Sequence, residues 1–106
     1  MTFAREAAAA SGVLVHASLY EKAPALDGTD DGLGFNTAVL VAPDGQVVAR
    51  TRKTHIPVTA GYHEDKYFRQ GPPDDAYPVY DLAGLAGVPG HIRLGMPPCW
   101  AEWFPE

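Results

Sequence analysis

FNTAVLVAPDGQVVARTRK, residues 35–53, is the stretch of this sequence that decides the fold. Two runs rich in apolar and β-branched residues, 35–42 and 46–53, flank the tripeptide Pro-Asp-Gly at 43–45. An Asp-Gly step between two such runs is typical of the turn of a β-hairpin. Because the first run is almost continuously apolar, we expect its strand to be buried on both faces of a sheet.

The segments around the hairpin predict further short elements. Residues 2–10 are rich in alanine and predict a helix, which Ser11-Gly12 should end. The remaining elements that we expect are strands at 13–20, 76–82 and 92–96, Gly-rich loops at 21–34 and 83–91, and an irregular segment at 54–73 with one helical turn near 63–68. Strands therefore dominate, with one helix at the start, as in a piece of a larger layered α/β fold.

Composition limits the classes of function. The chain has 106 residues, 46% of them hydrophobic, which predicts one small globular unit. The net charge of −5 argues against a surface for nucleic acid or for an anionic membrane. No run approaches the roughly 18 apolar residues that span a bilayer. A single cysteine cannot form an internal disulfide, so the sequence predicts a cytoplasmic location.

The sequence predicts no metal or cofactor. Its four histidines are scattered, without partners at metal-ligand spacing. The segment DGTDDG at 27–32 resembles a calcium loop, but Thr29 stands at its third position and Ala38 at its twelfth, where a glutamate is required. We therefore reject a calcium site.

Three residues are candidates for chemistry. A lone cysteine is most often a small buried hydrophobe, yet Cys99 ends an apolar strand, where nucleophiles are common. Strand alternation places Arg50 and Arg52 on one face and Lys53 on the other, and a buried lysine needs a partner. Glu64 by itself is most simply a residue of a surface turn.

Three ordered motifs change the weight of these candidates: RKTHIP at 52–57, GYHEDKYF at 61–68 and CWAEWFPE at 99–106. Together they resemble the nitrilase, or carbon–nitrogen hydrolase, superfamily, and within it the N-carbamoylputrescine amidases. The resemblance covers nearly all 106 residues. It implies an α/β fold, here a slice of the nitrilase-type α-β-β-α sandwich, made mostly of strands with a short N-terminal helix.

The resemblance also implies roles for individual residues. Cys99 matches the nucleophile, Lys53 the lysine that stabilises the tetrahedral intermediate, and Glu64 the glutamate that positions substrate and lysine. A thiolate attacks the carbonyl carbon, and donors aimed at the oxyanion stabilise the charge that develops.

The motifs imply further contacts and partners. Substrate or oxyanion contacts are expected from Trp100, His63 and Trp103, with the backbone N–H of Trp100 as an oxyanion donor. The expected substrate is a small carbamoyl-amine or linear amide such as N-carbamoylputrescine, in polyamine biosynthesis, with no cofactor and with a homo-oligomeric full-length protein. The Trp100/Trp103 pattern favours this branch over the alternative, a nitrilase or an aliphatic amidase.

One part of the family pattern is not matched. The general-base glutamate of the family lies before the matching segment, and neither Glu6 nor Glu21 stands in its place. Residues 1–106 are thus expected to be a single partial domain, without the base-bearing N-terminal part or the C-terminal half. Ala101 and Pro97-Pro98 also depart from the pattern. The alternative to an enzyme is therefore an inactive remnant or an interaction fragment, and we expect the chain alone to hydrolyse no amide.

Overall fold

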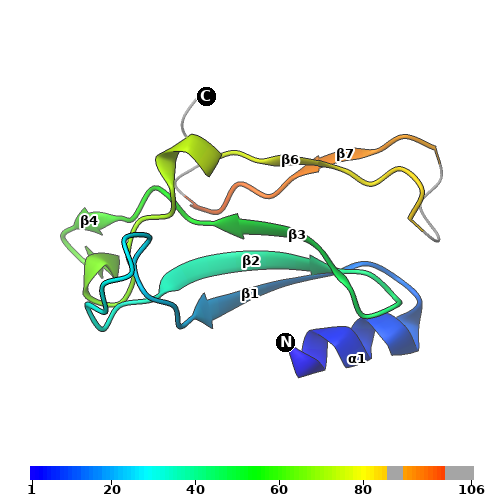
Figure 1. Ribbon diagram of the computed structural model, residues 1–106, viewed down its shortest axis with the longest axis horizontal. Helices are drawn as coiled ribbons and strands as arrows, with labels where there is room; N and C mark the ends of the chain where they lie inside the picture. Colours follow the sequence, from blue (N-terminus) through cyan, green and yellow to red (C-terminus); the bar gives the residue numbers. More distant parts are fainter. Residues whose placement is uncertain (86–89, 100–106) are drawn as a thin grey trace.

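The computed structural model describes residues 1–85 and 90–99 (Figure 1). The predicted hairpin forms strands β2, Phe35–Val41, and β3, Val47–Arg52, which pair antiparallel. Gly45 has a φ of 86° in the connecting turn, a left-handed conformation that glycine adopts without strain. Strand β1, Val15–Glu21, pairs antiparallel with the other edge of β2, so the sheet order is β1-β2-β3.

Helix α1, Thr2–Ser11, covers one face of this sheet (Figure 1). The helix ends at Gly12, whose φ is 72° and whose N–H donates to the carbonyl of Ala8. A first apolar cluster lies between helix and sheet and consists of Ala4, Ala8, Val39 and Val41, with Val15, Ala17 and Leu19 packed against it. The small alanines allow the helix to lie close to the strands.

A second hairpin lies on the opposite side of the sheet from α1 (Figure 1). Its strands are β6, Val79–Asp81, and β7, Arg93–Gly95, which pair antiparallel. A second cluster, of Leu40, Ala49, Leu82 and Met96, lies beneath it. Strand β2 therefore contributes to both clusters, which confirms that its strand is buried on both faces.

Several predicted bounds need correction. Strands 76–82 and 92–96 are shorter than expected, because Pro78, which has no N–H, precedes the last pair of the ladder, Val79 with Gly95. The segment 54–73 is less irregular than expected. It contains strands β4, Val58–Thr59, and β5, Tyr62–His63, and the 3₁₀ turns η1, Glu64–Lys66, and η2, which begins at Pro73 and ends at Asp75. In the part of the chain that the structure describes, no helix is long and apolar enough to cross a membrane.

Candidate functional site

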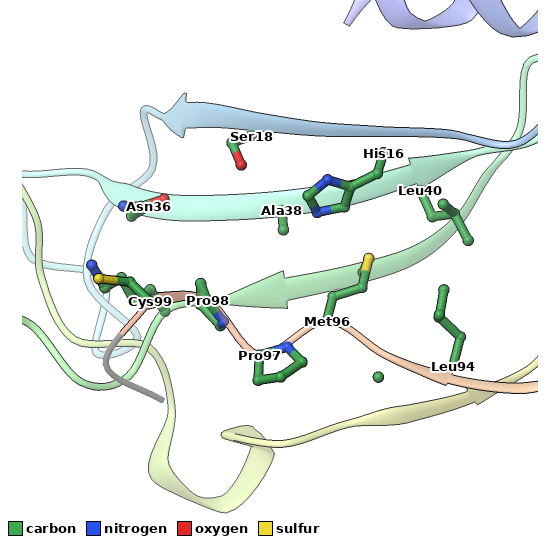
Figure 2. Close-up of a pocket in the computed structure, with 12 residues that line it drawn as sticks. His16, Ser18, Asn36, Ala38, Leu40, Leu94, Met96, Pro97, Pro98 and Cys99 are labelled. Atoms are coloured by element: carbon green, nitrogen blue, oxygen red, sulfur yellow. The ribbon is translucent and has the colours of Figure 1, made fainter. Parts of the chain in front are cut away.

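A cavity of about 630 Å³ opens on the face of the sheet away from α1 (Figure 2). Side chains from β1 and β2 form one wall, and the segment from β7 to Cys99 forms the other. The described residues that line it are His16, Ser18, Asn36, Ala38, Leu40, Lys53, Leu94, Gly95, Met96, Pro97, Pro98 and Cys99. The cavity thus brings together Lys53 and Cys99, which are far apart in the sequence.

Lys53 enters the cavity directly after β3. Its backbone is fixed on both sides, since its N–H donates to the carbonyl of Asn36 at 2.8 Å and its carbonyl accepts from Gly71 at 2.9 Å. The Lys53 side chain is only 2% exposed, and Nζ donates to both carboxylate oxygens of Glu64, at 2.8 and 3.1 Å. The buried ammonium therefore has its counter-charge, as burial of a lysine requires.

Glu64 begins the turn η1. Its carbonyl accepts hydrogen bonds from Tyr67 at 3.0 Å and Phe68 at 2.8 Å, and its own N–H donates to Pro57. These contacts direct the carboxylate toward Lys53. By itself the sequence favoured a surface turn. The turn is indeed there, and it carries the partner of Lys53.

Cys99 presents an exposed thiol at the end of the Pro97-Pro98 step. Its φ of 50° is left-handed, a conformation that costs a residue with a Cβ roughly 1–2 kcal/mol. A side chain on such a sharp turn projects away from its neighbours. The view of Cys99 as a buried hydrophobe is wrong, because the side chain is exposed and lines the cavity.

A second ion pair lies on the other face of the sheet. Arg52 donates to both oxygens of Glu21, at 2.7 and 3.0 Å, Thr37 donates at 2.6 Å, and Arg50 lies 3.6 Å away. The hydrogen bonding from Arg52, together with the hydrogen bond from Thr37, lowers the pKa of Glu21 to about 2. As predicted, Arg50 and Arg52 share the face opposite Lys53. This pair ties β1 to the end of β3, next to Lys53.

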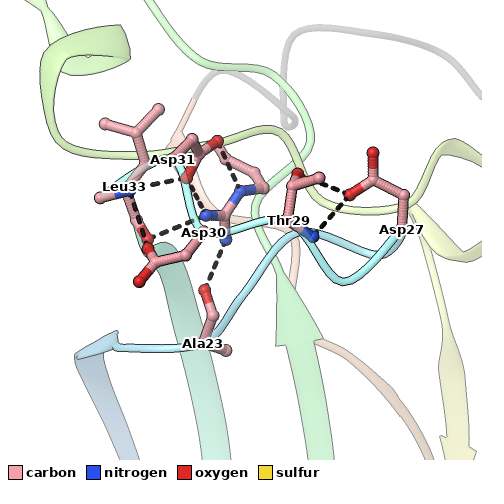
Figure 3. Close-up of polar contacts among 8 residues, drawn as sticks. Ala23, Asp27, Thr29, Asp30, Asp31 and Leu33 are labelled. Atoms are coloured by element: carbon pink, nitrogen blue, oxygen red, sulfur yellow. Dashed lines mark hydrogen bonds and ion pairs between the residues drawn. The ribbon is translucent and has the colours of Figure 1, made fainter.

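Arg69 holds the acidic loop between β1 and β2. Figure 3 shows Ala23, Asp31 and Leu33 of this loop, which all accept hydrogen bonds from Arg69. Its guanidinium donates to Asp31 and to the carbonyls of Ala23 and Leu33, and it lies over the ring of Phe35 at 4.8 Å. The hydrogen bond from Arg69 lowers the pKa of Asp31. The Asp31 carboxylate therefore serves to shape the loop. Across residues 1–85 and 90–99, no cluster of histidine, cysteine and acidic residues could hold a metal ion.

The remaining predicted site residues lie elsewhere. His63 is exposed in β5 and is not among the described residues that line the cavity. Trp100 and Trp103 lie outside the described residues. Sequence reasoning missed His16, Ser18 and Asn36, which line the cavity. The signal was the alternation along β1, where His16 and Ser18 are exposed while Val15, Ala17 and Leu19 pack against the cluster beneath α1.

The described part of the chain is thus an α/β fold that presents the thiol of Cys99 and the salt-bridged Lys53 to one cavity. Comparison with known sequences identifies the family. The family model described as carbon-nitrogen hydrolase matches residues 1–106, and the chain belongs to that family.

Individual relatives agree with this family. The chain is 30% identical to N-carbamoylputrescine amidase of Solanum lycopersicum, over 90% of this chain and 26% of the relative. It is 29% identical to a citrullinase of Francisella tularensis, over 89% of this chain and 27% of the relative. A carbon-nitrogen hydrolase structure from Helicobacter pylori G27 matches with a TM-score of 0.58 and 35% identity, over 68% of this chain and 22% of that one. The chain thus spans about a quarter of the length of these relatives.

Proposed function

We propose that this chain carries the nucleophile side of a hydrolase that cleaves a carbamoyl-amine or linear amide through a thioester on Cys99. One observation carries the proposal: Cys99 lines the same cavity as Lys53, a buried ammonium whose counter-charge is Glu64. An amide carbon placed at Cys99 has its carbonyl oxygen within the same cavity as a fixed positive charge. That arrangement supports electrostatic stabilisation of an oxyanion.

The hydrogen bonds of Lys53 suit this role. An ammonium has three N–H donors, and the Lys53 ammonium donates to both oxygens of Glu64. One donor is left for the oxyanion that forms when the Cys99 sulfur attacks the carbonyl carbon. Collapse of the tetrahedral intermediate breaks the carbon–nitrogen bond, and the nitrogen takes up the proton given up by the thiol and leaves as ammonia. Water then adds to the thioester carbonyl, the carbon–sulfur bond breaks, and the thiol is regenerated. In this scheme Glu64 is a positioning residue, because it acts through Lys53.

N-carbamoylputrescine is the first substrate to test, within polyamine biosynthesis, because the name of one relative contains it. We further propose that the full-length protein is a cytoplasmic homo-oligomer. The family's nitrilase and aliphatic amidase branches are the alternative. Carbamoyl-amines yield ammonia, carbon dioxide and an amine, whereas nitriles and simple amides yield ammonia and a carboxylic acid, so the release of carbon dioxide separates these branches.

A second candidate is a chain that is inactive by itself. It is supported by the lining of the cavity, where none of the described side chains is a carboxylate that could take a proton from the thiol or from water. Removing one member of a cooperating catalytic set commonly costs several powers of ten in rate. We therefore expect the purified 106-residue chain to show no sustained hydrolysis of N-carbamoylputrescine.

The decisive experiment uses p-nitrophenyl acetate, whose leaving group needs no proton. We expect one equivalent of nitrophenolate to be released and the mass of the chain to rise by one acetyl group, located on Cys99. Lys53→Met should slow this acylation about 100-fold, because an oxyanion donor is lost. Cys99→Ala should abolish it.

Lys22→Met is the matched control, because Lys22 is exposed and lies outside the cavity. It should leave the rate unchanged. Equal acylation rates in the Lys53→Met variant and the unchanged chain would overturn the role of Lys53. Acetylation spread over lysines, with Cys99 unmodified, would overturn the proposed nucleophile.

A further inference from the structure

We propose that His16 binds the polar far end of the substrate and so sets which carbon–nitrogen compounds the cavity accepts. This proposal rests on the proposed function, because it takes Cys99 as the place of the reacting carbon. The substrate class that follows is a linear amide or carbamoyl-amine whose tail ends in a hydrogen-bonding group.

The position of His16 is the first argument. Figure 2 shows Cys99 and Asn36 at one end of the cavity, and His16 with Leu40 at the other. The strand register agrees, because His16 pairs with Leu40 on β2, four residues beyond Asn36. At about 3.4 Å per residue, this separation is roughly 14 Å. A linear substrate attacked at Cys99 therefore extends along β2 toward His16.

The surroundings of His16 are the second argument. At this end of the cavity the neighbouring lining side chains are Leu40, Leu94 and Met96, which are all apolar (Figure 2). No described residue hydrogen-bonds the His16 ring. An imidazole has nitrogens that can donate or accept. His16 is thus the polar group placed to meet the end of a tail that crosses this apolar region.

The space between the two ends is the third argument. Ser18 projects from β1 next to His16 on the same face, and Ala38 lies opposite Ser18 on β2. A methyl group at Ala38 leaves the cavity open between its ends. The wall therefore allows an extended tail to lie flat along the sheet.

The test labels Cys99 with iodoacetamides of different tails, so that it requires neither a base nor an oxyanion donor. The sulfur displaces iodide, a carbon–sulfur bond replaces the carbon–iodine bond, and the thiol proton goes to the buffer. The reagents are N-(4-aminobutyl)-, N-(3-carboxypropyl)- and N-butyl-iodoacetamide. The rate of labelling is followed by mass spectrometry against reagent concentration, in the 106-residue chain and its variants.

We expect His16→Ala to raise the half-saturating concentration about 5-fold for a polar-tailed reagent, as the loss of one hydrogen bond implies. The maximal labelling rate should not change. The half-saturating concentration of the N-butyl reagent should not change either. His16→Gln, which can still donate and accept, should retain most of the affinity. The control is His91→Ala, whose side chain is 73% exposed outside the cavity. A larger loss with the ammonium tail or with the carboxylate tail identifies the charge of the natural tail.

Two outcomes would overturn the proposal. One is an unchanged half-saturating concentration for both polar-tailed reagents in His16→Ala. The other is an equal rise for the N-butyl reagent, which would give His16 a merely structural role. Failure of the proposed function appears separately, in the p-nitrophenyl acetate reaction and its dependence on Lys53.

Discussion

On the α1 face of the sheet, apolar side chains pack against the helix, and the polar groups next to them are paired. On the cavity face, β1 presents His16 and Ser18, and the sheet ends in Lys53. Adjacent residues at the end of β3 contact both faces, since Arg52, the last residue of the strand, binds Glu21 on one side and Lys53, which follows it, binds Glu64 on the other. An ion pair between a basic and an acidic side chain can therefore either stabilise the fold or form part of a site.

The two ion pairs differ in burial and in their remaining hydrogen bonds. Glu21 accepts from Arg52 and Thr37, so its charge is fully used within the sheet. Lys53 is more deeply buried than Arg52, with side-chain exposures of 2% and 17%. It also lines the cavity, where a donor remains available.

Among the substitutions that test this contrast, removal of the Glu64 carboxylate should destabilise the fold most. Glu64→Ala leaves the Lys53 ammonium buried without a counter-charge, which we expect to lower the free energy of unfolding by about 3 kcal/mol. Urea denaturation measures the change. Adding Lys53→Met to this variant should recover most of the loss. Asp65→Ala, at the exposed neighbouring position, is the control, and an equal loss there would contradict the assignment.

The stability of the fold should be sensitive to a methyl group added at Gly71, next to the end of β3. A Cβ on Gly71 would lie 2.5 Å from the carbonyl oxygen of Arg52, so Gly71→Ala must displace the end of β3. We expect a loss of about 2 kcal/mol in unfolding free energy and slower acylation of Cys99. At Gly95 a Cβ would meet only an ordinary contact at 3.8 Å, so Gly95→Ala should be nearly neutral in stability. Equal losses in the two variants would argue against this packing.

Acid should weaken the ion pair between Glu21 and Arg52 on the α1 face of the sheet. The pKa of Glu21 falls from 4.5 to about 2 on folding, so the folded state favours the ionised form. Its contribution is present above pH 4.5 and is lost as the pH falls toward 2. Allowing for solvent screening, we expect the ionised Glu21 to contribute about 1–2 kcal/mol to the free energy of unfolding. Glu21→Gln should remove this part of the pH dependence of unfolding, and the exposed Glu6→Gln should preserve it.

The smallest changes in stability are expected at two buried threonines, one on each face of the sheet. Thr37 donates to Glu21 at 2.6 Å, whereas Thr51 Oγ1 has no hydrogen-bond partner among the described residues. Thr37→Val should therefore destabilise by about 1 kcal/mol, and Thr51→Val should stabilise by about 0.5–1 kcal/mol. Thermal melts of the two variants measure this. Shifts of the same sign would show that the two faces do not differ in this way.

Much of the fold could be predicted from local pattern. The Asp-Gly turn and the two β-rich runs predicted the central hairpin, and the near-continuous apolar run predicted that β2 has two buried faces. Strand alternation placed Arg52 and Lys53 on opposite sides. The lengths of β6 and β7 could not be predicted, because they depend on where two distant segments pair.

The hairpin, the helix and the three ordered motifs can be recognised from the sequence, because each is encoded in neighbouring residues. The pairing of Lys53 with Glu64, in contrast, depends on the tertiary structure. A lysine at a strand end and a glutamate in a turn carry no local sign of each other. Their pairing, and the cavity that Lys53 shares with Cys99 and His16, arise because β1, β2 and the second hairpin are brought together by burial of their apolar faces.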